Sequence, residues 1–197
     1  MISRRGLLLA GGSAVWLAGC ERVARLGASA PAPEVFAAPS GTSLDLAQHV
    51  LARCSFGIRP GDRAALLALG PTQAEAARAW LEQQLEPQKL GDEACERALA
   101  RCDSLGAPIG ELYEYKPQVL LRELTAAALL RATLSRRQLY EVLVEFWTDH
   151  FNISVEKGAC WLLKTVDDRE VIRPHALGRF GDLLWACLLY TSDAADE

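Results

Sequence analysis

Hydrophobic residues recur every three or four positions along most of the chain, the spacing that places them on one face of an α-helix. Near the start of this pattern, Leu44, Ala47, Val50 and Cys54 share such a face. The segments that the spacing predicts as helices are residues 44–57, 59–70, 74–85, 92–103, 117–134, 136–151, 160–172 and 176–186. No segment alternates in the manner of a β-strand. The pattern therefore predicts an all-α, multi-helix domain over residues 44–186.

Polar residues mark where two of these helices begin. Thr72 with Glu75, and Ser135 with Gln138, have the spacing of a capping box, in which the two side chains satisfy the first backbone N–H groups of a helix. The segment 117–134 is apolar almost all round, which is typical of a helix buried on every side. We therefore expect it to be the central helix of the domain.

The first twenty residues have the pattern of an export signal. Arg4 and Arg5 precede a moderately apolar run over residues 7–19, which indicates a twin-arginine leader. A helix over that run rises only about 20 Å, short of the roughly 30 Å hydrocarbon core of a bilayer. The run ends in Leu-Ala-Gly before Cys20, which resembles the lipobox of bacterial lipoproteins. We expect residues 1–19 to be a signal peptide and Cys20 to be lipidated; the alternative is an ordinary leader with an incidental cysteine.

The residues after the leader are rich in Ala, Pro, Ser and Gly, a composition typical of a flexible tether. We assign residues 20–43 to such a tether. More than one acyl chain holds a protein firmly to a membrane. Because residue 21 is Glu rather than Asp, the usual sorting pattern favours the outer membrane. The expected location is the periplasmic side of a bacterial cell envelope.

The last eleven residues, 187–197, read CLLYTSDAADE. This string matches one reading frame of the transposase adapter of a common DNA-sequencing library kit. Segments of this origin are set aside before the fold is considered. We therefore expect residues 187–197 to be non-native and the helical domain to be truncated after Ala186; the alternative is a genuine acidic tail.

Composition narrows the classes of function. The chain has 21 Lys and Arg against 25 Asp and Glu, for a formal net charge of −4. A nucleic-acid-binding protein normally carries a basic surface, so we expect no nucleic-acid partner. Apart from Cys20 and Cys187, the chain has four cysteines: Cys54, Cys95, Cys102 and Cys160. No CxxC pair occurs among them, and buried free thiols are favoured over disulfides, which an oxidising envelope would also permit.

Two segments carry side chains that could do chemistry. At the end of the helix over 136–151, His150 closes an apolar stripe, with Trp147 one turn before it. Arg169 and Arg173 lie four residues apart, hence on one helical face. Pro174 is predicted to end that helix, which would turn His175 outward.

Several segments together resemble one known family. ARCSFGIRPGD, AWLEQQL, LSRRQL, EFWTDHFNIS and DREVIRPHALGRFGDLL occur in the order seen in the N-terminal part of the domain of unknown function 1800 family. Its members are large exported bacterial proteins without an established activity. They are often encoded beside exported proteins related to sulfatases, so the resemblance implies a sulfatase-related partner. On this chain the most recognisable family positions are Trp147, His150, Asn152, Arg169, Arg173 and His175.

These residues allow two interpretations. In the functional one, His150 and His175 approach each other, and the two arginines bind an anionic substrate or cofactor group. In the structural one, His150 is a hydrogen-bonded core histidine, and the arginines pair with Asp167, Asp168 or Glu170. No HxxxH or HExxH spacing predicts a metal site. The leading hypothesis is a lipid-anchored binding or assembly component; the alternative is an envelope enzyme using both histidines, with an unknown reaction and cofactor.

Overall fold

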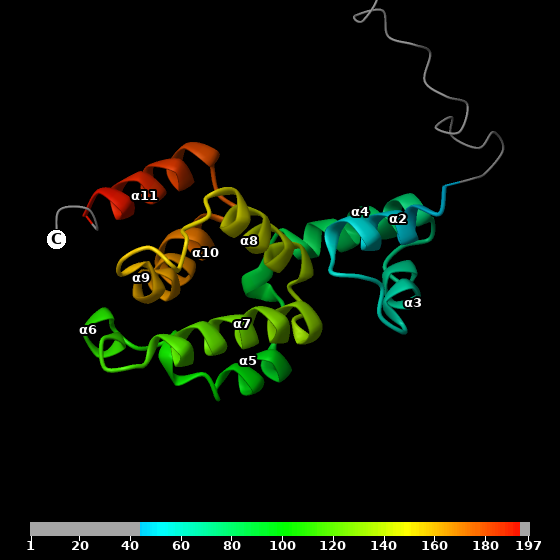
Figure 1. Cartoon of the computed structure of the whole chain (residues 1–197). Helices are drawn as coiled ribbons and strands as arrows, with labels where there is room; N and C mark the ends of the chain where they lie inside the picture. Colours follow the sequence, from blue (N-terminus) through cyan, green and yellow to red (C-terminus); the bar gives the residue numbers. More distant parts are fainter. Residues whose placement is uncertain (1–43, 194–197) are drawn as a thin grey trace, which may run out of the picture. The chain divides into compact units, whose positions relative to one another are not determined.

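The computed structural model describes residues 44–193 of the 197-residue chain, with side chains to residue 189 (Figure 1). Its α-helices are α2 (Leu46–Cys54), α3 (Asp62–Leu67), α4 (Gln73–Gln84), α5 (Glu93–Leu99), α6 (Ile109–Leu112), α7 (Pro117–Leu134), α8 (Gln138–His150), α9 (Cys160–Val166), α10 (Arg173–His175) and α11 (Phe180–Asp193). Two short 3₁₀ helices, η2 (Pro87–Lys89) and η3 (Asp103–Leu105), and a π-helical segment, η4 (Asp167–Ile172), complete this range. No strand occurs within it, which confirms the all-α prediction.

Some predictions fall on residues that the structure does not describe. The signal peptide with Arg4 and Arg5, the lipidated Cys20 and the tether to residue 43 all lie outside the described range. Helix α11 continues beyond Ala186, and Cys187 packs against the cluster around Val144. The non-native origin of residues 187–197 stays a prediction.

The two predicted capping boxes have different outcomes. At α4 the cap by Thr72 is confirmed: its hydroxyl accepts the Glu75 backbone N–H at 3.3 Å, and it donates to the Glu75 carboxylate at 2.7 Å, which therefore bonds the hydroxyl and not a backbone N–H. At α8 it is wrong. The Ser135 hydroxyl accepts the Arg137 N–H at 3.0 Å and donates to the Asp92 carboxylate at 2.6 Å, so Ser135 joins the start of α5 to the turn before α8.

Gln138 likewise serves a junction between elements. Its amide donates to the Ser135 carbonyl at 2.8 Å, and its oxygen accepts the Phe56 N–H at 3.1 Å. Asp92 accepts the Arg136 N–H at 2.7 Å. Gln138 and Asp92 are both buried. A buried backbone group needs a partner, and these two side chains provide one for the turn between α7 and α8.

Helix α7 is buried on one side only, so the prediction of burial all round is wrong. Leu120 and Ala127 are fully buried, whereas Leu129 is 63 % exposed. The helix contacts α5, α8, α9 and η3, which cover only part of its circumference. Figure 1 shows α5 running beside α7. The uncovered face, with Ala128 and Leu129, borders a pocket described below.

Three separate hydrophobic clusters hold these helices together. Helices α2, α3 and α4 enclose Ala47, Val50, Leu51, Leu66, Ala76 and Ala77. The second cluster joins α6, α7 and α9 and consists of Ala107, Leu112, Leu120, Leu162 and Val166. The third joins α8, η4 and α11 and consists of Val144, Ile172, Ala176 and Leu183. Among the described helices, none is long and apolar enough to span a membrane.

The chain stays helical across Pro174, where the sequence predicted an end. A proline inside an α-helix offers no N–H and clashes with the carbonyl four residues before it. Here the preceding η4 is π-helical, and the Arg173 N–H donates to the Asp168 carbonyl, five residues back. The wider π turn displaces the carbonyls before the proline. The helix therefore continues through α10, which carries Pro174.

Candidate functional site

Two carboxylates hold the side chain of Arg173. Its Nη1 and Nη2 donate to Glu141 Oε1 and Oε2 at 3.1 and 2.8 Å, and its Nε donates to Asp168 Oδ2 at 2.9 Å. All three side chains are at most 15 % exposed. A two-point pair between guanidinium and carboxylate is directional as well as strong. Arg173 therefore fixes η4 and α10 against α8.

Arg131 of α7 completes a group that we call the ion cluster: Arg131, Glu141, Asp168 and Arg173. The Nη1 of Arg131 lies 3.5 Å from Asp168 Oδ2, and its side chain is 15 % exposed. That distance exceeds the range of a good N–H···O hydrogen bond. The cluster holds two cations and two anions, so it is formally neutral. Its four members come from four helical segments, α7, α8, η4 and α10, which it joins.

The two arginines of the cluster are not equally compensated. Burial opposes the charged form of Arg173, but its hydrogen bonds to Glu141 and the negative charges of Asp168 and Glu141 outweigh burial and raise its pKa. For Arg131, burial and the positive charge of Arg173 outweigh the same two carboxylates and lower the pKa. The negative charges of Glu141 and Asp168 therefore stabilise mainly Arg173, and the charge of Arg131 is less well compensated.

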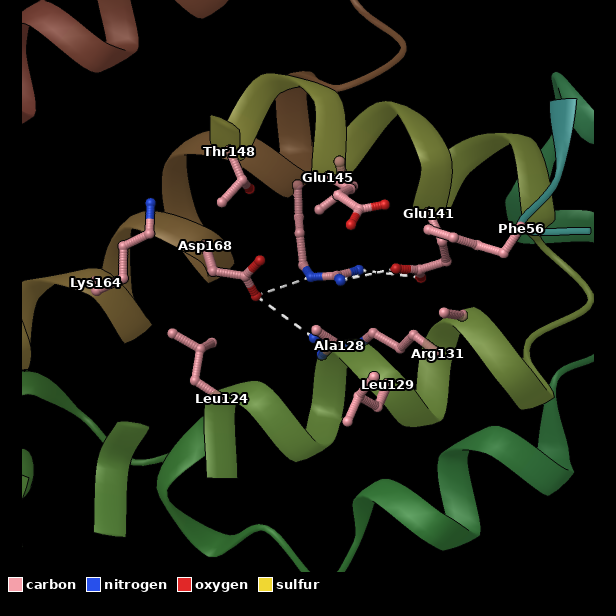
Figure 2. A pocket seen from close by; sticks show the side chains of 13 residues that line it. Phe56, Leu124, Ala128, Leu129, Arg131, Glu141, Glu145, Thr148, Lys164 and Asp168 are labelled. Carbon is pink, nitrogen blue, oxygen red and sulfur yellow. Dashed lines mark hydrogen bonds and ion pairs between the residues drawn. The ribbon is translucent and has the colours of Figure 1, made fainter. Parts of the chain in front are cut away.

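A pocket of about 250 Å³ opens over the ion cluster (Figure 2). Its apolar wall comes from α7 and α8, with Leu124, Ala128, Leu129, Ala132 and Val144, and Phe56 reaches it from the segment after α2. Arg173 pairs with both Glu141 and Asp168, and Figure 2 shows Arg131 of α7 approaching Asp168. The pocket therefore combines an apolar wall with a charged floor held in place by its own ion pairs.

A second buried ion pair borders the pocket. The Lys164 ammonium lies 3.1 Å from Asp167 Oδ2, and the side chains are 7 % and 3 % exposed. Burial raises the pKa of Asp167, although the charge and hydrogen bond of Lys164 oppose that rise. Lys164 lines the pocket, but its charge is already matched by Asp167.

Trp147 and His150 belong to an aromatic cluster on α8 rather than to the pocket. The Trp147 Nε1 donates to the Ala176 carbonyl at 3.2 Å. The His150 ring stacks on Phe146 at 5.9 Å between centroids and meets Phe151 edge-on at 4.8 Å. His150 is exposed, so the alternative of a hydrogen-bonded core histidine is wrong.

His175 has a defined tautomer. Its Nδ1 lies 2.7 Å from the Val171 carbonyl oxygen, and because a carbonyl only accepts, Nδ1 carries the proton. In the neutral form of the ring, Nε2 is then the nitrogen with the lone pair. Within the described range, no hydrogen bond or ring contact joins His175 to His150. The approach of the two histidines, which the functional interpretation requires, stays a hypothesis.

The two predicted arginines serve different parts of the molecule. Arg169 donates from Nη1 to the carbonyls of Leu105 and Ala107 at 2.9 and 2.8 Å, and from Nη2 to Glu170 at 2.7 Å. Arg173 instead lies in the ion cluster. The structural interpretation, in which the arginines pair with neighbouring carboxylates, is confirmed for Arg169 with Glu170 and for Arg173 with Asp168.

Asn152, the remaining predicted site residue, lies exposed in the turn after α8, and it is not among the residues that line the pocket. Cys54, Cys95, Cys102 and Cys160 are free thiols, as their spacing favoured, and Cys95 and Cys102 are buried. In this range no three His, Cys, Asp or Glu side chains gather closely enough to hold a metal ion.

Sequence reasoning missed two members of the ion cluster. Glu141 lies three residues before Val144, within the buried face of α8, and a carboxylate there needs a cationic partner. Arg131 lies in a helix that is otherwise almost wholly apolar towards its end. A charge at an apolar helical position was the available signal for both. Asp168 was considered only as a structural partner for the arginines.

The fold and the pocket define an all-α protein with a small, mainly apolar cavity over a buried ion cluster. The chain belongs to the family described as "Protein of unknown function (DUF1800)", whose model matches residues 49–191. This match confirms the resemblance seen in the sequence. Comparison with curated proteins found no match, and neither did comparison with solved structures.

Proposed function

We propose that this protein is an exported, lipid-anchored component of a bacterial cell envelope that binds a ligand in its pocket and works with an exported partner. The location is supported by the paired Arg4 and Arg5 before a short apolar run and by Cys20 at its end. Lipid chains at Cys20 would hold the helical domain at the membrane surface.

The binding role rests on one observation: a pocket of about 250 Å³ whose two buried carboxylates, Glu141 and Asp168, are already paired with Arg173. Glu141 and Asp168 both accept hydrogen bonds from Arg173. A general base must be within reach of the proton that it takes from a substrate. Carboxylates engaged in this way offer a preorganised polar surface, which suits recognition better than proton transfer.

Changing Arg4 and Arg5 to Lys, and separately Cys20 to Ser, tests the location. We expect the double Lys variant to remain in the cytoplasm with its leader uncleaved. The Cys20→Ser protein should leave the membrane fraction for the soluble fraction. Cell fractionation with immunoblotting measures both. Unchanged export of the first variant, or unchanged membrane attachment of the second, would refute this part of the proposal.

A neutral apolar fluorescent probe, N-phenyl-1-naphthylamine, tests the pocket. The full chain with Cys20→Ser is used in every arm, so that no lipid or detergent competes for the probe. We expect the wild-type pocket to bind the probe with a rise in fluorescence, because apolar surface leaves water. Ala128→Trp, which fills the pocket from its wall, should weaken binding at least about tenfold. Ala94→Trp, at an exposed position of α5, is the matched control and should bind as the wild type does.

One observation favours the second candidate, an envelope enzyme that uses His150 and His175. In the neutral form of His175, the Nδ1 contact with Val171 orients the lone pair of Nε2, an arrangement suited to accepting a proton or to binding a metal. His150→Ala and His175→Ala are compared with His49→Ala, an exposed histidine of α2. If both folded variants keep the wild-type content of metal and of tightly bound ligand, measured by elemental analysis and mass spectrometry, this candidate is excluded.

A further inference from the structure

We infer that the pocket binds a small monocarboxylate with an apolar body, with the carboxylate at Arg131 and the body against the wall formed by α7 and α8. This inference rests on the proposed binding role and adds the chemical class of the ligand. Two observations support it. The carboxylates of the ion cluster bond mainly to Arg173 and leave Arg131 less compensated, and an exposed apolar face lies beside the cluster.

Arg131 has hydrogen-bond donors that the described chain does not use. A guanidinium carries five N–H groups. The guanidinium of Arg131 contacts Asp168 Oδ2 at 3.5 Å. That oxygen already accepts a hydrogen bond from Arg173 Nε at 2.9 Å. No shorter contact of the Arg131 side chain occurs among the described residues. Because the side chain is only 15 % exposed and lines the pocket, a ligand in the pocket can reach donors that bulk water meets poorly.

The electrostatic environment of Arg131 also favours an anionic group beside it. Burial and the charge of Arg173 lower its pKa, which means that its positive charge is incompletely compensated. A negative group placed against Arg131 supplies the missing compensation. The neighbouring Lys164 does not compete for that group, because Asp167 already pairs with it at 3.1 Å.

The surrounding carboxylates limit the charge of the ligand. Glu141 and Asp168 lie within the ion cluster, and Glu145 also lines the pocket. A second negative charge on the ligand would be repelled by these three groups. A planar carboxylate also matches the fork of a guanidinium. The site therefore suits a monoanionic carboxylate better than a phosphate dianion.

The apolar wall of the pocket indicates the chemical nature of the rest of the ligand. Leu124, Ala128 and Val144 line it, and Leu129 remains 63 % exposed to solvent. An apolar body laid against these side chains removes their surface from water, which is the main driving force for apolar binding. A volume of about 250 Å³ favours a small molecule over a folded protein surface.

Octanoate is the probe for this inference, and 1-octanol and octyl phosphate have the same chain with a different head group. Isothermal titration calorimetry on the full chain with Cys20→Ser measures all three. We expect octanoate to bind about tenfold more tightly than 1-octanol, which is the effect of one charge-assisted hydrogen bond. Octanoate that binds no more tightly than 1-octanol would overturn the inference, and so would octyl phosphate binding more tightly than octanoate.

Arg131→Gln should lower the affinity for octanoate to that of 1-octanol and leave 1-octanol unchanged. Arg122→Gln, at an exposed position of the same helix, is the matched control and should leave octanoate binding unchanged. Retained octanoate affinity in Arg131→Gln would contradict the inference. If that variant does not fold, Leu129→Ser at the exposed wall should weaken both octanoate and 1-octanol about threefold, and an unchanged affinity for both would contradict the placement.

Displacement of the naphthylamine probe separates the two proposals. If 1-octanol displaces it and octanoate does so no better, the pocket binds apolar ligands and only the carboxylate specificity is overturned. If neither the neutral probe nor octanoate binds, the binding role and the inference both fail.

Discussion

The guanidinium of Arg173 meets both carboxylate oxygens of Glu141, at 3.1 and 2.8 Å, across the interface between α10 and α8. Both side chains are almost buried. A buried ion pair adds little stability relative to well-packed apolar residues, because removing two charges from water is costly. Removing one partner alone is much more costly, since it leaves the other charge buried without compensation. The pair therefore makes each partner dependent on the other.

Glu141→Gln should lower the free energy of unfolding by about 3 kcal/mol, because it leaves the buried Arg173 charge with Asp168 alone. Urea denaturation followed by circular dichroism measures the change. Glu145→Gln, one turn further along α8 and exposed, is the matched control and should stay within about 0.5 kcal/mol of the wild type. Equal stability of the two variants would show that the ion pair does not stabilise this interface.

Asp92→Ala should lower the free energy of unfolding by about 2 kcal/mol. Its carboxylate accepts the Ser135 hydroxyl at 2.6 Å and the Arg136 N–H at 2.7 Å, and hydrogen bonds to charged groups are among the stronger ones. Glu93→Ala, the exposed neighbour, should change stability much less. Chemical denaturation of both variants compares them, and a similar loss in both would argue against a junction role for Asp92.

The buried thiol of Cys95 makes stability depend on pH. Burial, with the nearby charge of Asp92, raises its pKa to about 11 from the ordinary 9.0. Because the folded-state pKa is the higher one, the unfolded chain loses this proton first as pH rises. The contribution of the thiol to stability is therefore complete below about pH 9 and is lost as pH rises to about 11.

Cys95→Ala isolates this effect from the lysines and tyrosines that titrate in the same window. We expect the free energy of unfolding of the wild type to fall more steeply between about pH 9 and about pH 11 than that of the variant. Denaturation curves recorded at several pH values give both slopes. Parallel slopes would mean that Cys95 keeps its ordinary pKa in the folded state.

Thr165 has a buried hydroxyl that finds no hydrogen-bond partner in the described structure. An unsatisfied buried polar group lowers stability. Thr165→Val removes the hydroxyl and keeps the shape, so we expect the thermal midpoint to rise and the free energy of unfolding to increase by about 1 kcal/mol. Thr165→Ser keeps the hydroxyl and deletes a methyl, and it should lower stability by about 1 kcal/mol. A lower midpoint for the Val variant would indicate that the hydroxyl has a partner.

The sequence by itself predicted the helices of the domain closely, because their signals are local. The 3.6-residue spacing of apolar positions located α2, α4, α7 and α8. Thr72 caps α4 through groups only three residues apart in the sequence, so the beginning of α4 could also be predicted. The family resemblance was equally accessible, since short motifs in a fixed order carry it.

Only the tertiary structure decided which face of α7 is left open and that Arg173 pairs with Glu141 as well as with Asp168, the partner that the sequence had offered. In a regular α-helix, residues five apart lie about 140° from each other around the axis, which would place Asp168 and Arg173 on different faces. The π turn of η4 brings them onto one side, and folding brings Glu141 against Arg173 from 32 residues earlier in the chain. The sequence of a single helix predicts neither the π turn nor this contact. The hydrogen-bond register of η4 and the packing of Glu141 against Arg173 both depend on other elements of the fold.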